Sequence, residues 1–141
     1  MKNMRILLLL TLTFASLAGR AQQVRISNFT VDKLPAKEDA LEQLFDIHFS
    51  LSELTPAMLE IVASPDSTCA GIWMDLYHIK KYGNEYYLKH KGDRTRLMDK
   101  NIHFTITMDK MAAEMYPVFC LSAKRNEQVI SNQVQAGLKT K

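Results

Sequence analysis

The chain has 141 residues and a formal net charge of +3, from 18 Lys and Arg against 15 Asp and Glu. That excess belongs to the first 21 residues, which contain three basic residues and no acid, so the remainder carries no net charge. A domain without net positive charge does not attract nucleic acid through its overall charge, so we expect no nucleic-acid partner. About 120 residues suffice for one domain with a core of its own.

Residues 1–21 have the three parts of a cleavable signal peptide. A charged start at Lys2 and Arg5 precedes an apolar run over 6–18, and small residues stand before a cut at Gln22. The run is shorter than the roughly 20 residues that a bilayer span needs, and no later stretch approaches that length. We therefore expect an exported product, periplasmic or extracellular, with no stable membrane anchor after cleavage.

Alternation of apolar and polar side chains with a period of two recurs along the rest of the chain and predicts β-strands. The first spans 24–31, where a slip in the apolar phase between Ile26 and Phe29 indicates a β-bulge. Residues 45–51 and 102–108 alternate most regularly, and each strand turns one face to a core and the other to water. The side chains predicted to face water are Asp46, His48 and Ser50 on one strand and His103, Thr105, Thr107 and Asp109 on the other.

Shorter strands are predicted between these two. Residues 59–63 form one, which ends in the turn Pro65-Asp66-Ser67. Residues 77–81 and 85–89 flank Tyr82-Gly83-Asn84, a pattern typical of a hairpin with a three-residue loop that contains Gly.

Helical signals are weak. Residues 36–44 and 109–115 each allow one or two helical turns, but neither sustains a 3.6-residue period over a full helix. The last residues, 136–141, have the composition of a frayed tail.

The sequence contains two cysteines, Cys69 and Cys120, and export would place them where a disulfide persists. A bridge would close a loop of about 50 residues and stabilise the fold by about 4 kcal/mol through loop-closure entropy. The alternative is that Cys120 packs as a small buried hydrophobe on a strand. Spacing alone does not show whether the sulfurs meet, so both interpretations stay open.

Residues 116–134 read Tyr-Pro-Val-Phe-Cys-Leu-Ser-Ala-Lys-Arg-Asn-Glu-Gln-Val-Ile-Ser-Asn-Gln-Val, and we predict that Tyr116, Val118 and Cys120 alternate inward. A Tyr that opens one strand and a Ser-Asn pair that precedes the next resemble the end of a fibronectin type III or related immunoglobulin-like domain. The resemblance implies an all-β, antiparallel sandwich of about seven strands, with a tyrosine corner in which the Tyr116 hydroxyl bonds to upstream backbone. It also implies a scaffold that binds or spaces more often than it catalyses.

Two further resemblances concern export. The short Leu-rich signal followed by Gln22-Gln23 resembles, in style, the signals of exported Bacteroidetes proteins. Leu17-Ala18-Gly19 resembles the start of a bacterial lipoprotein box, but Arg20 stands where the lipidated cysteine would be. We therefore expect no lipid anchor.

Sequence motifs that carry catalysis are absent. The five Gly residues are scattered, which excludes a phosphate loop or dinucleotide fingerprint, and no Cys-x-x-Cys, His-Glu-x-x-His or Gly-x-Ser-x-Gly occurs. Acidic residues fall on outward strand positions or in loops, and no pair has a spacing that marks a general acid and base. We therefore expect no enzyme, no catalytic residues and no cofactor.

The predicted hairpin combines aromatic and basic residues. Tyr rings supply contact area with a hydrogen-bonding tip, and adjacent Lys and Arg attract sulfate, carboxylate or phosphate groups. The alternative is that alternate Tyr side chains pack inward while Lys residues protect an edge strand from aggregation. This alternative is favoured, because half of the side chains in any hairpin must point inward. The candidate binding residues are Tyr77, Lys80, Lys81, Tyr82, Tyr86, Tyr87, Lys89, Lys91 and Arg94.

His48 and His103 are both predicted to face water. In an immunoglobulin-like sandwich their strands are neighbours, so the two imidazoles would approach across the sheet. Two ligands make an incomplete site, and the alternative is two solvent-exposed imidazoles. We therefore predict no metal.

Together these features predict a signal peptide at 1–21 and one β-sandwich domain at 22–141, acting as a non-catalytic binding or interaction module. The favoured partner is a glycan or an acidic protein surface of the cell envelope. The alternative is a structural or accessory subunit of an envelope assembly that pairs through an exposed strand edge.

Overall fold

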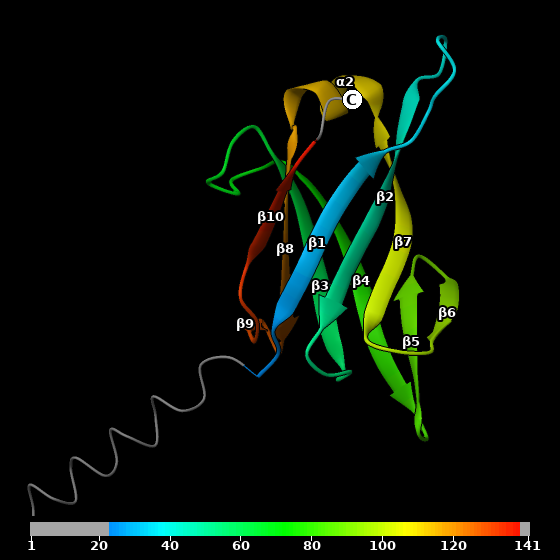
Figure 1. Cartoon of the computed structure of the whole chain (residues 1–141), viewed down its shortest axis with the longest axis vertical. Coiled ribbons are helices and arrows are strands. Elements are labelled where there is room, and N and C mark those ends of the chain that lie inside the picture. Colours follow the sequence, from blue (N-terminus) through cyan, green and yellow to red (C-terminus); the bar gives the residue numbers. More distant parts are fainter. Residues whose placement is uncertain (1–22, 139–141) are drawn as a thin grey trace, which may run out of the picture.

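The computed structural model describes residues 23–138, which form two antiparallel β-sheets packed face to face (Figure 1). The prediction of an all-β sandwich is confirmed. The predicted signal peptide lies outside the described residues. None of the helices among residues 23–138 is long and apolar enough to cross a membrane.

The small sheet has three strands. They are β1 (Ile26–Lys33), β2 (Glu42–Leu51) and β7 (Asn101–Asp109), in the order β1-β2-β7. The predicted bulge in β1 is confirmed, because its register against β2 shifts between Ser27 and Thr30. Beyond the shift, Thr30 pairs with His48 and Asp32 with Asp46, so outward side chains of β1 extend the outward face of β2.

The large sheet has seven strands, and its main path has the order β10-β8-β3-β4-β5-β6, with β9 paired to β8. Their bounds are β3 (Ala57–Ser64), β4 (Trp73–Tyr82), β5 (Glu85–His90), β6 (Asp93–Leu97), β8 (Val118–Arg125), β9 (Gln128–Val129) and β10 (Val134–Gly137).

The core lies between the sheets and is built by the inward half of each alternating strand. Phe45 on β2 and Phe119 on β8 are both fully buried, and their ring centroids lie 5.1 Å apart. The predicted inward phase of β8 is wrong by one residue. Leu121 points inward with Phe119, whereas Cys120 pairs with Val62 on the outer face. The error arose because Cys120 is buried too, by a loop and not by the core.

The predicted hairpin is confirmed as β4 and β5, with a tighter turn than expected. Tyr82 pairs with Glu85, so two residues form the turn, and Gly83 has φ +60° at the first central position. A two-residue turn of this kind favours Gly there. β6 was not predicted, because its exposed sequence Asp-Arg-Thr-Arg lacks apolar alternation.

Of the two segments predicted to allow helical turns, only one is helical in the structure. Residues 36–44 are not helical, because the alternation of β2 extends back to Glu42. The second segment forms α2 (Lys110–Met115), whose N-cap Asp109 accepts hydrogen bonds from the backbone of Met111 and Ala112 at 2.9 and 3.2 Å.

Tyr116 caps the carboxyl end of α2. Its backbone N–H donates to Ala112 O at 2.9 Å, and its ring packs partly buried against the core. Within residues 23–138 its hydroxyl has no hydrogen-bond partner, so the tyrosine corner stays a prediction.

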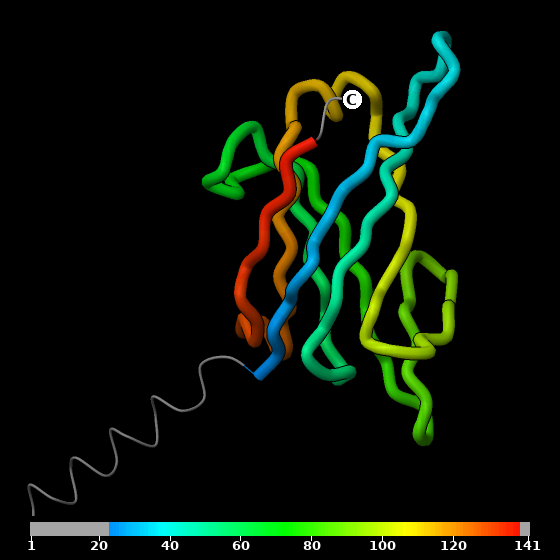
Figure 2. Tube along the Cα trace, viewed as in Figure 1, coloured from blue at the N-terminus to red at the C-terminus, as the bar shows by residue number. Residues whose placement is uncertain are grey.

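The two ends of the described chain lie along one side of the sandwich. Val24 forms a parallel bridge with Ser131, and the Asn132 amide both accepts from Ile26 N at 2.8 Å and donates to Ile26 O at 2.9 Å. β1 and β10 then run side by side in the same direction (Figure 2). The predicted tail at 136–141 begins too early, because Ala136 and Gly137 belong to β10, and residues 139–141 lie outside the described residues.

Candidate functional site

A row of five side chains, four of them basic, crosses the outer face of the large sheet. In register, Lys124 pairs with Met58, Met58 with His78, His78 with Lys89, and Lys89 with Arg94. Directly paired residues project to the same face, and neighbouring strands lie about 4.8 Å apart, so the row spans roughly 19 Å over five strands. We call these five residues the basic row.

A second line of side chains lies beside the basic row. Lys80 pairs with Tyr87, and Tyr87 pairs with Arg96. The Tyr87 hydroxyl donates to Glu85 Oε2 at 2.6 Å, and Arg96 Nη2 lies 2.6 Å from Glu85 Oε1. Glu85 therefore neutralises Arg96, whereas Lys80 forms no ion pair within residues 23–138.

Two Tyr rings and one guanidinium form an exposed platform at the end of the basic row. The Arg94 guanidinium lies 3.9 Å from the Tyr87 ring centroid and 4.7 Å from that of Tyr82. The two rings meet edge to face at 5.7 Å, and Tyr82 is 44% exposed. Because cation–π contacts hold Arg94 over the rings, the platform presents both charge and an apolar face.

Two hollows lie along these residues. One of about 250 Å³ is lined by His78, Lys80, Lys89, His90, Lys91 and Gly92. A second, of about 200 Å³, lies between β4 and the end of β8 and shares His78 and Lys80 with the first. The two hollows therefore adjoin the same two side chains, and both have basic residues in their walls.

The structure divides the nine candidate binding residues between the two faces of the hairpin. By register with the basic row, the outer face carries Lys80, Tyr82, Tyr87, Lys89 and Arg94. Lys91 lies in the β5–β6 turn, and Lys81 and Tyr86 pair on the inner face, where the Lys81 ammonium lies 5.5 Å from the Tyr86 ring centroid. Tyr77 is 3% exposed and belongs to the core, not to the surface.

Tyr77 is held in the core by two stacked rings. Its centroid lies 4.0 Å from those of His90 and Phe104. Its hydroxyl is buried, and no described residue forms a hydrogen bond to it. Burial, and then the charge of the nearby Asp75, raise the pKa of Tyr77 well above its ordinary value. Asp75 itself is bound by His90 Nε2, which lies 2.9 Å from Oδ1 and 2.8 Å from Oδ2.

Sequence reasoning missed His78 and Lys124 as parts of this surface. Period-two alternation places His78 on the Lys80 face of β4, which is a local signal. Lys124 comes from β8 and reaches the basic row only through the β3–β8 and β3–β4 pairings. No local pattern predicts such long-range register.

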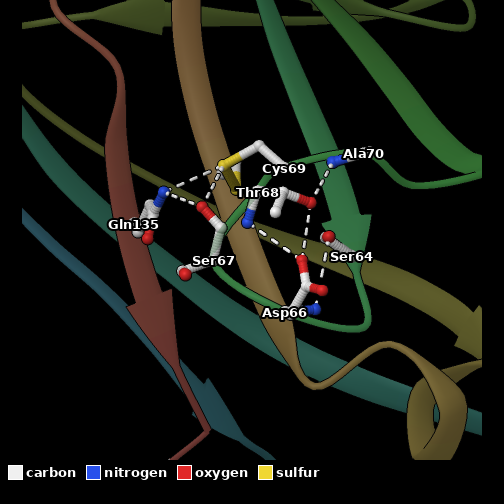
Figure 3. The surroundings of a disulfide bond; sticks show 8 residues. Ser64, Asp66, Ser67, Thr68, Cys69, Ala70 and Gln135 are labelled. Carbon is white, nitrogen blue, oxygen red and sulfur yellow. Dashed lines mark hydrogen bonds between the residues drawn. A yellow bond between two sulfur atoms is a disulfide. The ribbon is translucent and has the colours of Figure 1, made fainter.

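The opposite end of the same outer face is covered by a covalently fastened loop (Figure 3). Cys69, in the β3–β4 loop, forms a disulfide with Cys120 on β8, so the structure contains the bridge that the sequence left open. Gln135 Nε2 donates to Ser67 O at 2.6 Å and ties the loop to β10. Asp66 Oδ1 accepts from Thr68 Oγ1 at 2.6 Å and Thr68 N at 2.9 Å, which lowers the pKa of Asp66.

The outer face of the small sheet brings the two predicted histidines together. His48 and His103 are direct partners in the β2–β7 register, and their rings stack at 4.1 Å with an interplanar angle of 8°. Asp46 joins them, since its Oδ1 lies 2.6 Å from His103 Nε2 and its Oδ2 lies 3.5 Å from His48 Nε2. The hydrogen bond from His103 is the main cause that lowers the pKa of Asp46.

Comparison of the chain with protein-family models, with curated proteins and with solved structures gives no significant match. Function is therefore inferred from the two outer faces of the sandwich.

Proposed function

We propose that this chain is an exported, non-catalytic binding module that binds an acidic polysaccharide across the outer face of its large sheet. The observation that carries this proposal is the basic row, which borders two hollows and ends at the Tyr82–Tyr87–Arg94 platform. A straight row with basic side chains at four of its five positions suits a linear polymer whose negative charges repeat along its length. The signal-like residues 1–21 support export.

An immunoglobulin-like or fibronectin type III-like architecture forms part of the proposal. In immunoglobulin-like sandwiches strands A, B and E face strands C, F and G. Equating β1, β2 and β7 with the first set and β3, β8 and β10 with the second is compatible with the strand order. The disulfide differs from the antibody pattern, because it fastens a loop to one sheet and does not join the two sheets.

The charges available to a ligand are not equal along the surface. Lys124 Nζ lies 2.8 Å from Glu60 Oε2, so that ion pair already satisfies it. Lys80, Lys89 and Arg94 form no ion pair within residues 23–138, and the Arg94 guanidinium lies over the Tyr82 and Tyr87 rings. These three cations therefore supply most of the attraction, and Tyr82 offers a ring to the apolar face of a sugar.

The test measures retention on immobilised heparin, a sulfated polysaccharide, with neutral dextran as the uncharged reference. We expect heparin to retain the chain and dextran to let it pass, with retention falling as salt shortens the screening length to about 8 Å. The triple variant Lys80→Gln, Lys89→Gln, Arg94→Gln should elute at clearly lower salt. Its free energy of unfolding should change by no more than roughly 0.5 kcal/mol per site.

A matched control separates a surface effect from net charge alone. The triple variant Lys33→Gln, Lys37→Gln, Lys100→Gln loses the same three charges from exposed positions away from the basic row. It should elute close to the unchanged chain. Equal losses for the two triple variants, or retention on dextran, would refute the proposal.

The free edge of β7 supports a second candidate, a subunit that pairs with an envelope protein by strand addition. β7 is nine residues long, contains no Lys, Arg or Pro, and pairs only with β2 among the described strands. Such an unprotected edge is a template for another strand. A photo-crosslinker at exposed Thr107, in the native host, should give one discrete adduct that is lost when Thr105 is replaced by Lys. A smear or no adduct would reject this candidate.

A further inference from the structure

Three polar side chains, Asp46, His48 and His103, lie on the outer face of the small sheet. β2 is the middle strand, and His48 and His103 are direct partners across β2 and β7. Asp46 lies two residues before His48 on the same face, opposite Thr105. One ligand atom from each of the three lies within 4.8 Å of the other two.

The orientation of these side chains brings their donor atoms together. Both imidazoles direct Nε2 toward the same carboxylate, His103 at 2.6 Å from Oδ1 and His48 at 3.5 Å from Oδ2. Ligands on a tetrahedral Zn²⁺ at about 2.0–2.1 Å lie roughly 3.3 Å from each other. The Asp46–His48 separation is already close to that value, and the Asp46–His103 pair needs to open by less than about 1 Å.

The surrounding charge favours a cation. Asp32 on β1 pairs directly with Asp46, and the exposed Glu42 and Asp109 pair at the end of the same face. In register, no Lys or Arg of the described strands β1, β2 and β7 projects onto this face. A divalent ion would therefore lie among acidic and neutral side chains of these three strands.

We propose that Asp46, His48 and His103 bind Zn²⁺ or another late first-row divalent cation on the outer face of the small sheet. Two imidazole nitrogens and one carboxylate oxygen suit Zn²⁺, Ni²⁺ and Cu²⁺, whereas Mg²⁺ and Ca²⁺ require oxygen ligands. The side chains of Asp46, His48 and His103 are 25%, 47% and 55% exposed, so the remaining coordination positions face solvent. A bound ion therefore keeps places for a donor from another molecule.

The test titrates ZnCl2 into the purified chain, prepared without a polyhistidine tag, by isothermal calorimetry. We expect one Zn²⁺ per chain and no heat with MgCl2. His48→Gln and His103→Gln should each weaken Zn²⁺ binding by about tenfold or more, because even the loss of a residue that only hydrogen-bonds to a metal ligand costs that much. Asp46→Asn should also weaken it. His78→Gln, on the other sheet, is the matched control and should bind Zn²⁺ as the unchanged chain does.

A second measurement locates the ion without relying on the variants. Paramagnetic Ni²⁺ should broaden the NMR signals of His48 and His103 before those of His78 and His90. Broadening centred on His90, or Zn²⁺ affinity that survives in both His48→Gln and His103→Gln, would overturn the proposal. So would the absence of heat on adding ZnCl2 to the unchanged chain.

Discussion

The two outer faces of the sandwich follow the same strand alternation and yet differ in charge and in the kinds of side chain that they carry. The outer face of the small sheet carries short polar and acidic side chains and two stacked imidazoles. Strand pairing brings these side chains together. The face of the large sheet is covered at one end by a disulfide-fastened loop and is open, basic and aromatic at the other. Residues 22–141 carry no net charge, yet they form a sandwich with one acidic and one basic side.

The largest effect is expected from removing the disulfide that fastens the β3–β4 loop to the covered end. The double variant Cys69→Ser, Cys120→Ser should lose about 4 kcal/mol of unfolding free energy, because the bridge spans 51 residues and restricts the unfolded chain. Urea unfolding measures the loss. Heparin retention at the open end should persist if the variant folds, because the basic row is built by strand register. A loss below about 1 kcal/mol would show that the loop needs no covalent fastening.

A smaller effect distinguishes the structural Tyr residues from the exposed ones. Tyr77→Phe removes a buried hydroxyl that has no partner, so it should leave stability unchanged or raise it by about 1 kcal/mol. Tyr82→Ser should instead lower heparin retention with little change in stability, since that ring is 44% exposed. A marked destabilisation by Tyr77→Phe would mean that the hydroxyl is hydrogen-bonded after all.

The smallest effect concerns pH at the covered end. Hydrogen bonds from the Thr68 side chain and backbone lower the folded-state pKa of Asp66. The ionised carboxylate therefore adds stability above the unfolded pKa near 4, and this contribution disappears as pH falls through the lower folded value. An NMR titration should find the Asp66 pKa below its ordinary value, and Thr68→Val should bring it back up. An ordinary pKa in the unchanged chain would contradict the hydrogen bonds.

The sequence predicts much of the fold because the core strands alternate cleanly. Phe45, Ile47 and Phe49 mark β2 without ambiguity, and the phase slip after Ile26 predicts the bulge in β1. β8 is the instructive failure. A continuous run of buried residues from Phe119 to Ala123 has no visible phase, because the β3–β4 loop buries the outer positions as the core buries the inner ones.

The sequence predicts which side chains of a candidate site share a face of one strand, but not how distant strands align. His48 and Asp46 lie two residues apart on one strand, so their shared face follows from the sequence, and the neighbouring strand brings His103 to them. Asp46 completes the cluster, and nothing beyond that same alternation was needed to include it. The basic row is different, since its residues come from β8, β3, β4, β5 and β6, and register across five strands depends on long-range pairing.

The two hydrogen bonds between the Asn132 amide and the Ile26 backbone, here called the Asn132 clamp, make the resistance of the molecule to force depend on the direction of pulling. β1 begins at one end of the long axis and β10 finishes near the other, beside α2 (Figure 1). A pull applied between these two ends loads the clamp and the Val24–Ser131 bridge along the strand direction, so the bonds share the force and do not open one after another. The sandwich should therefore resist stretching between its ends better than peeling of β6, which a single neighbouring strand holds.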